Sequence, residues 1–201
     1  MILLARAFFD RDPREVAPDL LGKVLVSRVD GVETGGVIVE TEAYLGEGDP
    51  GSHASTRGIT PRNSVMYGPP GTVYVYFTYG CHHMLNLVCD HEGVAGAVLI
   101  RAIEPSLGLD VMSRRRSGKS GVEIANGPGK LAEALGIDRS DNGSALQVGR
   151  ISVYDAPGPI PSAIATSGRI GLSVGNELLF RYFITGSASV SRTRPGPPGA
   201  R

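Results

Sequence analysis

The chain has 201 residues, a hydrophobic fraction of 41% and equal numbers of acidic and basic residues, 20 of each. This length suits one domain with a sizeable core, and no apolar run approaches the roughly 20 residues of a membrane span, so we expect a soluble, intracellular protein. The balanced charge gives no indication of a polyanionic partner, because a protein that binds by counterion release alone would be more basic.

The cysteine content is typical of an intracellular protein. Cys81 and Cys89 are the only cysteines, whereas small secreted scaffolds carry more. If both lie on one extended strand, they are roughly 26 Å apart, which is too far for a disulfide. We therefore expect two free thiols.

Arginine dominates the basic residues, because Lys23, Lys119 and Lys130 are the only lysines. Arginine suits two-pronged contacts with phosphate, but an arginine-rich genome would give the same composition. The bias therefore leaves the partner open.

The first predicted elements are a short helix and an antiparallel pair of strands. Asp12 resembles a helix N-cap, with Pro13 at the first helical position and Glu15 completing a capping box, and Gly22 follows the predicted end of the helix. Residues 23–29 alternate between apolar and polar. The dipeptide Asp30-Gly31 then predicts a two-residue hairpin turn.

The returning strand, residues 36–46, carries the first candidate chemistry. Alternation along a strand places Ile38, Glu40, Glu42 and Tyr44 on one face. Two carboxylates and a phenol therefore share a side with an apolar residue, which suggests a functional reason for burying them.

Residues 46–70 form a predicted long loop, rich in Gly, Pro, Ser and Thr, and loops of this length are often functional. His53, Arg57, Arg62 and Asn63 lie in it and could face a ligand. His53 taken alone is more compatible with a surface histidine than with a ligand contact.

A tyrosine-rich hairpin follows. Residues 71–80 predict a strand with Tyr74 and Tyr76 on one face, residues 81–89 a returning strand, and residues 95–102 a third strand that ends near Arg101. Tyr79 would then lie near an exposed hairpin tip. The tyrosines suit either cross-strand packing or stacking of nucleobases.

The rest of the chain begins with helices. Residues 105–116 and 126–135 are predicted helices, and the N-terminus of the second, with Lys130, could bind one phosphate, although Walker spacing is absent. Residues 151–154 and 164–172 predict strands, and residues 177–183 a strand or short helix. Residues 191–201 form a basic, Pro/Gly-rich tail that we expect to be disordered, so that residues 1–190 make the domain.

These residues together suit a flat heterocycle. Glu42 offers a carboxylate base, the tyrosines and a loop histidine offer stacking surfaces, and Asn86 and Arg101 offer amide and guanidinium donors. Nothing in the sequence fixes which strands pair, so the convergence of these groups is a hypothesis.

The order and spacing of several motifs resemble the alkyladenine (3-methyladenine) DNA glycosylase family over nearly the whole chain. The motifs are Glu40-Thr41-Glu42-Ala43-Tyr44, His53, Thr60-Pro61-Arg62-Asn63, Gly71-Thr72-Val73-Tyr74-Val75-Tyr76, Tyr79-Gly80, Asn86, Leu99-Ile100-Arg101-Ala102 and Gly127-Pro128-Gly129-Lys130-Leu131.

The resemblance implies a mixed α/β domain with a curved, mainly antiparallel sheet, short flanking helices and a protruding hairpin. It also implies a monofunctional enzyme that flips alkylated or deaminated purines out of duplex DNA and hydrolyses the N-glycosidic bond, leaving an abasic site in base excision repair. We expect a monomer that needs no metal or cofactor, in the bacterial cytoplasm and associated with the nucleoid.

The resemblance further implies a role for each matching residue. Glu42 is the general base that activates water, and Arg101 positions both. The flipped base lies between Tyr44, His53 and Tyr76, and Asn86 discriminates against the 2-amino group of guanine. The side chain that enters the vacated stack is Tyr79, while Lys130 and Arg62 contact phosphate. Independently of the resemblance, Glu40 lies about 7 Å back along the strand from Glu42, and we expect it to be structural.

Some features depart from the family or leave alternatives open. Cys81 and His82 stand where relatives carry bulkier apolar or aromatic residues, which puts contacts beside Tyr79 in doubt. His82, His83 and His91 suggest a metal-dependent hydrolase, although adjacent histidines on a strand point to opposite faces. A DNA-binding module without catalysis is the other alternative, and the presence of both Glu42 and Arg101 argues against it.

Overall fold

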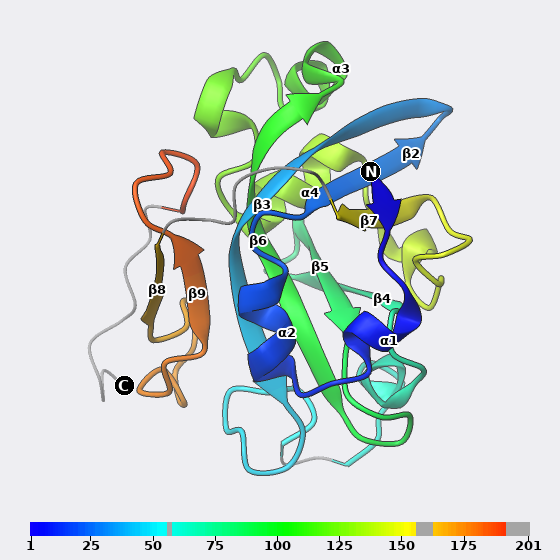
Figure 1. Cartoon of the computed structure of the whole chain (residues 1–201), viewed down its shortest axis with the longest axis vertical. Coiled ribbons are helices and arrows are strands. Elements are labelled where there is room, and N and C mark those ends of the chain that lie inside the picture. Colours follow the sequence, from blue (N-terminus) through cyan, green and yellow to red (C-terminus); the bar gives the residue numbers. More distant parts are fainter. Residues whose placement is uncertain (56–57, 156–162, 192–201) are drawn as a thin grey trace.

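The computed structural model describes residues 1–55, 58–155 and 163–191 (Figure 1). Within these residues the α-helices are α1 (Arg6–Phe9), α2 (Pro13–Asp19), α3 (Leu109–Arg115) and α4 (Pro128–Leu135). The 3-10 helices are η1 (Ser64–Tyr67), η2 (Gly121–Ile124) and η3 (Arg139–Asp141). The strands are β1 (Ile2–Leu3), β2 (Val24–Val29), β3 (Val32–Leu45), β4 (Val73–Thr78), β5 (His82–Val88), β6 (Gly96–Leu107), β7 (Ile151–Asp155), β8 (Ile164–Ser167) and β9 (Arg181–Ile184).

All of the described strands belong to one antiparallel sheet. Its main order is β1-β7-β2-β3-β6-β5-β4, while β9 pairs with the second half of β3 and β8 pairs with β9. Figure 1 shows the β8 and β9 pair standing beside β3. The predicted mixed α/β fold with a mainly antiparallel sheet and short helices is confirmed.

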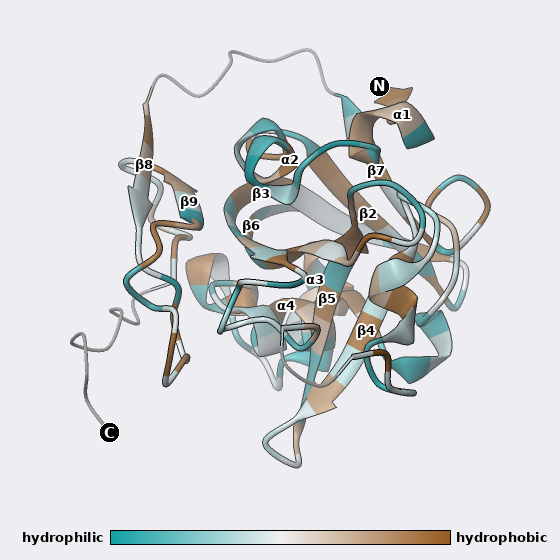
Figure 2. Cartoon of the chain, turned by 90° about the horizontal axis from the view of Figure 1, so that it is seen from below, coloured by the Kyte–Doolittle hydropathy of each residue, from teal (hydrophilic) through white to brown (hydrophobic). Residues whose placement is uncertain are grey.

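The local signals explain the turns that join these elements. Asp30 and Gly31 connect β2 to β3 with φ angles of 56° and 72°, the left-handed conformation of a tight hairpin. Asp12 caps α2, since its side chain accepts a hydrogen bond from the backbone N–H of Arg14 at 2.7 Å. Three residues, 79–81, connect β4 to β5, and this hairpin extends beyond the rest of the sheet in Figure 2.

The core lies between the sheet and the helices. α2 packs on β3 and α4 packs on β5, and the largest apolar cluster includes Phe9, Leu20, Leu85, Ile100 and Leu131. A second, smaller cluster contains Tyr74, Met66 and Val88. No helix among the described residues is long and apolar enough to cross a membrane.

The pairing of β3 with β6 is irregular where the candidate catalytic residues lie. The register shifts between Ile38 and Glu40 and again between Glu40 and Thr41, so that Val39 on β3 and Arg101 on β6 have no partner in the ladder. Such bulges redirect side chains. Ile38 consequently joins the apolar cluster that contains Ala43, so the strict alternation that placed Ile38 beside the carboxylates is not observed.

Several predicted boundaries differ from the observed ones. β6 continues to Leu107, so Pro105 lies in a strand and the helix after it begins only at Leu109, after a turn at Gly108 with φ of 64°. β8 ends at Ser167 rather than at residue 172. Residues 192–201 of the predicted tail lie outside the described residues, whereas Ser191 is buried.

Candidate active site

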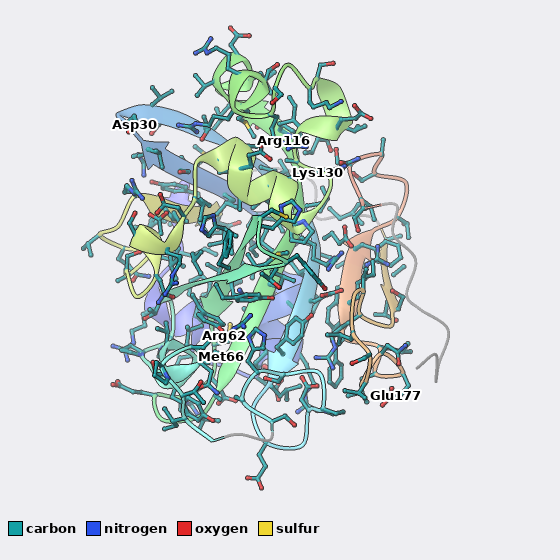
Figure 3. The ribbon with its side chains drawn as sticks, turned by 180° about the vertical axis from the view of Figure 1, so that it is seen from behind. Asp30, Arg62, Met66, Arg116, Lys130 and Glu177 are labelled. Carbon is teal, nitrogen blue, oxygen red and sulfur yellow. The ribbon has the colours of Figure 1, made fainter. Side chains whose placement is uncertain are left out.

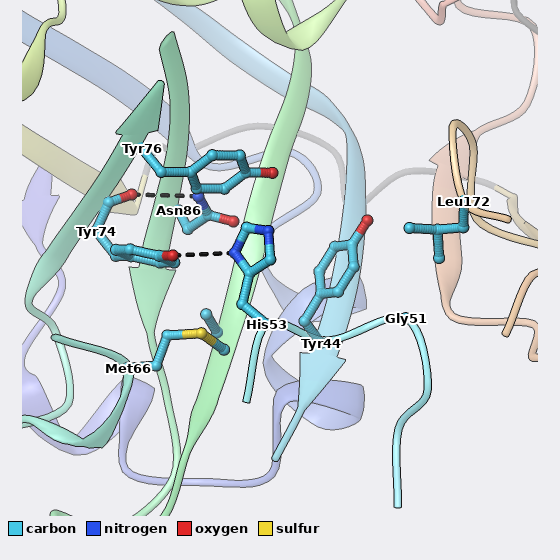
Figure 4. Close-up of a pocket in the computed structure, with 9 residues that line it drawn as sticks. Tyr44, Gly51, His53, Met66, Tyr74, Tyr76, Asn86 and Leu172 are labelled. Atoms are coloured by element: carbon cyan, nitrogen blue, oxygen red, sulfur yellow. Dashed lines mark hydrogen bonds between the residues drawn. The ribbon is translucent and has the colours of Figure 1, made fainter. Parts of the chain in front are cut away.

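A small pocket opens between β3, β4, β5 and the loop that follows β3. Its cavity of about 60 Å³ is several times larger than the roughly 10–15 Å³ that a single water molecule needs. The residues that line it are Tyr44, Gly51, His53, Met66, Tyr74, Tyr76, Asn86, Ala97 and Leu172 (Figure 4).

The pocket has aromatic walls that support one another. The His53 ring packs edge-on against the Tyr76 ring at 4.7 Å between centroids, and its Nδ1 lies 3.1 Å from the Tyr74 hydroxyl. Figure 4 shows Tyr44 on one side of His53 and Tyr74 and Tyr76 on the other. Stacking on such faces is how proteins hold a flat heterocycle.

These aromatic groups are uncharged at neutral pH. Burial raises the pKa of Tyr74 to about 12, and burial together with the nearby Glu42 carboxylate raises the pKa of Tyr44 well above its ordinary value. Burial, and then the charge of Arg62, lower the pKa of His53 below 6.5. The aromatic side chains of the pocket walls therefore carry no charge of their own that would repel a positively charged flat ring.

Asn86 is fixed at the pocket by the backbone around it. It is 3% exposed, and its Nδ2 donates to the carbonyls of Tyr74 and Met84, each at 3.2 Å. Because both amide N–H groups are used, the side chain cannot turn without losing these bonds.

Glu42 lies beyond the pocket wall, at the hydroxyl end of Tyr44, and is fully buried. Its Oε2 accepts a hydrogen bond from the Tyr44 hydroxyl at 2.8 Å and lies 3.2 Å from Nη1 of Arg101. Its Oε1 accepts the backbone N–H of Ile170 at 2.7 Å. Three donors therefore fix the orientation of this carboxylate.

Glu40 is the second buried carboxylate, and it is held by four donor groups against three for Glu42. Its Oε1 accepts from Nε of Arg101 at 2.9 Å and from Nε of Arg181 at 2.7 Å, and Ser191 donates both its N–H and its hydroxyl. Burial alone would raise the pKa of Glu40, but Arg101 and Arg181 outweigh it and hold the pKa below 4.5. Glu40 does not line the pocket.

Arg101 connects the two carboxylates. It is 4% exposed and contacts Glu40 through Nε and Glu42 through Nη1. Its place in the β6 irregularity lets one side chain reach both strand positions. Two guanidiniums, from Arg101 and Arg181, thus balance two carboxyl groups in the middle of the sheet.

The predicted DNA-contacting residues lie outside the pocket. Tyr79, at the tip of the β4–β5 hairpin, is 76% exposed and has a φ of 52°. The guanidinium of Arg62 lies 5.2 Å above the Tyr76 ring, and Nζ of Lys130 on α4 donates to Asn126 at 2.8 Å. Figure 3 labels Arg62 and, on α4, Lys130.

The structure thus brings Tyr44, His53, Tyr76 and Asn86 into one pocket and places Glu42 with Arg101 directly behind it. Arg57 lies outside the described residues. Among the described residues, no group of three or more His, Cys, Asp or Glu could hold a metal ion. The cysteines are free, as predicted, with Cys81 exposed and Cys89 buried.

Sequence reasoning missed the residues that support the site from behind, most of which lie far away in the chain. They are Asp49, Arg169, Ile170, Leu172, Arg181 and Ser191. Tyr74 had a detectable signal, since alternation placed it on the face of Tyr76. The others have no local pattern that marks them.

The sequence model for the methylpurine-DNA glycosylase family matches residues 7–188. This chain belongs to that family. The family's enzymes are hydrolases that act on N-glycosyl bonds of damaged bases in DNA, and this member is such a glycosylase. The predicted family resemblance is confirmed.

Curated relatives cover the chain almost end to end. Two proteins named "Putative 3-methyladenine DNA glycosylase", from Chlorobaculum tepidum and Chlorobaculum parvum, are 47% and 50% identical over 196 residues, which are 97% of this chain and 93% of each relative. A protein of the same name from Methanoculleus marisnigri is 46% identical over 192 residues, 94% of this chain and 98% of the relative.

Proposed function

We propose that this glycosylase flips a methylated or deaminated purine nucleotide out of duplex DNA and hydrolyses its N-glycosidic bond with water, leaving an abasic site. The observation that carries this proposal is the buried, triply held Glu42 carboxylate at the end of an aromatic pocket. A base stacked in the pocket would have its sugar directed toward this carboxylate.

Glu42 acts as the general base. Its Oε1 accepts one backbone N–H and retains a lone pair for a water molecule, while its negative charge stabilises the oxocarbenium character that develops at the sugar. Arg101 holds the other carboxylate oxygen and helps to orient the water. Because these partners are fixed before substrate binds, little reorganisation accompanies the reaction.

The pocket selects the base. Tyr44, His53 and Tyr76 stack on its faces, and uncharged aromatic rings favour electron-poor, alkylated purines. Asn86 would meet the 2-amino group of a normal guanine, and two backbone carbonyls prevent it from moving away. This is a repulsive element of the kind that specificity requires.

The exposed residues hold the DNA. Tyr79 occupies the space that the flipped nucleotide leaves in the stack, and Arg62 and Lys130 contact phosphates on either side. Arg62 forms no salt bridge with the described residues, and the Tyr79 ring is exposed, so both side chains can turn toward DNA.

The mechanism uses water rather than an amine. Lys23 pairs with Asp155 at 2.8 Å, Lys119 lies 4.0 Å from Glu123, and Lys130 bonds to Asn126, so no lysine lines the pocket. A lyase needs such an amine for a Schiff base.

The test is an excision assay on duplexes that carry 3-methyladenine, 7-methylguanine, hypoxanthine or etheno-adenine, with an undamaged duplex as control. We expect release of the free base from at least one lesion duplex, an intact strand until alkali is added, and no adduct with borohydride. Absence of release from every lesion duplex, or an efficient borohydride adduct, would overturn the proposal.

A further inference from the structure

A buried guanidinium lies just behind the pocket wall and does not line the pocket itself. Arg169 is fully buried, and its Nη1 and Nη2 each donate to one oxygen of Asp49 at 2.6 Å. Nη1 also donates to the carbonyl of Ala43 at 3.0 Å, and Nη2 to that of Gly175 at 3.1 Å. Two-pronged ion pairs of this kind fix both partners in one geometry.

Arg169 supports two groups of the proposed reaction. Its guanidinium lies 4.7 Å from the centre of the Tyr44 ring, which forms the pocket wall and donates to Glu42. The next residue, Ile170, donates its backbone N–H to Oε1 of Glu42 at 2.7 Å. A shift of Arg169 would therefore move a pocket wall and a donor to the carboxylate together.

Asp49, the partner of Arg169, holds the loop that leads from β3 to His53. Its Oδ2 accepts the N–H of Leu45 and its Oδ1 accepts the N–H of Gly51, both at 3.0 Å. Gly51 lines the pocket, and His53 follows two residues later. The ion pair thus joins the loop that carries His53 to the loop that carries Ile170 and Leu172.

The junction is packed without spare room. A Cβ on Gly51 would lie 2.6 Å from Cδ1 of Leu172 and 2.7 Å from Nη2 of Arg169. Nε of Arg169 is buried without a partner among the described residues, which carries a desolvation cost.

We propose that Arg169 and Asp49 are positioning residues for base excision, in that their buried ion pair holds the Ile170 N–H on Glu42 and the Tyr44 ring at the pocket wall. This inference rests on the proposed function of Glu42 and Tyr44. Neither residue touches the base or the sugar.

Arg169→Gln, Asp49→Asn and the double variant test the inference through the single-turnover excision rate at saturating enzyme. The melting temperature and the Kd for a duplex that carries a tetrahydrofuran abasic analogue are measured alongside. Each single variant leaves one buried charge without its partner and lowers the melting temperature, whereas the double variant recovers most of it.

We expect excision to fall about 100-fold in the single variants and to stay at least about 30-fold low in the double variant, since misplacement by about 1 Å costs this much. The Kd should change by less than about threefold. If Arg169→Gln fails to fold, Arg169→Lys keeps the charge but loses the two-pronged geometry, and the same loss of rate with a near-normal Kd is expected.

Arg28→Gln is the matched control. Arg28 also lies over a tyrosine ring, at 5.7 Å from the centre of Tyr154, and also pairs with a carboxylate, but it lies on β2 away from the pocket. Its excision rate should remain within about twofold of the wild type.

Recovery of excision together with the melting temperature in the double variant would overturn the inference and leave the proposed function intact. An equal loss of excision rate in Arg28→Gln would also overturn the inference and leave the proposed function intact. An inactive wild-type chain would overturn both.

Discussion

The centre of the sheet and the tip of the β4–β5 hairpin hold their candidate functional side chains in opposite environments. Glu40, Glu42, Arg101 and Arg181 are at most 6% exposed, whereas Tyr79 is 76% exposed. The buried groups are fixed by one another, and the exposed ring of Tyr79, the proposed DNA contact, lies in solvent. Bond cleavage needs charges that are oriented in advance, while insertion into DNA needs a side chain with no prior partner.

Of all the substitutions, replacement of Glu42 at the centre of the sheet should lower the excision rate the most. Glu42→Gln keeps the size of the side chain but removes the base, so excision should fall by about a thousandfold. Binding of a lesion duplex should change only a few-fold, because no DNA contact is removed. Single-turnover excision and binding by fluorescence anisotropy measure the two quantities, and unchanged excision would remove Glu42 from the mechanism.

Replacing Glu40 should separate structural support from chemistry. Glu40→Gln leaves Arg101 and Arg181 with too little negative charge, so the free energy of unfolding should fall by about 3–5 kcal/mol. Excision should fall less than in Glu42→Gln, by roughly tenfold, since only the positioning of Arg101 changes. Urea unfolding and the excision assay give the two values, and the reverse order of activity loss would contradict the assignment.

Glu40 also sets an expected pH dependence. Its pKa in the folded protein lies below 4.5 because Arg101 and Arg181 outweigh the effect of burial. The stability that its charge contributes is therefore complete above pH 4.5 and is lost as the pH falls through the folded pKa. Melting curves between pH 3 and 6 should show a steeper loss for the wild type than for Glu40→Gln, and parallel curves would argue against this linkage.

At the hairpin tip the effect should be smaller and confined to binding. Tyr79→Ala removes the inserted ring, and stacking of about 1–3 kcal/mol predicts roughly tenfold weaker binding of a lesion duplex. The melting temperature should not change, since the ring is exposed. Tyr79→Phe is the control and should bind like the wild type.

The smallest expected effects concern the phosphate contacts. Lys130→Ala and Arg62→Ala should each weaken DNA binding a few-fold and reduce the slope of log K against log salt by about 1. Lys119→Ala, which removes an exposed lysine near Glu123, serves as the control. A salt slope that matches the wild type in both variants would place the phosphates elsewhere.

The parts of the fold that follow from short-range signals could be predicted. Asp30-Gly31 gave the first hairpin, Asp12 and Pro13 gave the start of α2, and alternation placed Tyr74 and Tyr76 on one face. These signals depend on neighbours a few residues away. The family resemblance predicted that His53 lines the pocket. The alternation of apolar and polar residues could not predict this, because it applies to strands and His53 lies in a loop.

The supporting residues could not be predicted, for a physical reason. Arg169 meets Asp49 across 120 positions and Arg181 meets Glu40 across 141, and no local periodicity encodes such contacts. The bulged pairing near Arg101 also breaks the alternation on which the strand prediction relied. The roles of the matching residues remain predictions from the resemblance, supported by their convergence.

The hydrogen bonds between Ser191 and Glu40 have a consequence for how the enzyme is made. Both the N–H and the hydroxyl of Ser191 bind a carboxylate that lies 151 positions earlier in the chain. A nascent chain that has emerged only to residue 150 carries the aromatic residues of the pocket and Arg101, but not Arg169, Arg181 or Ser191. The two carboxylates can therefore gain their full set of hydrogen-bond donors only after residue 191 has been synthesised.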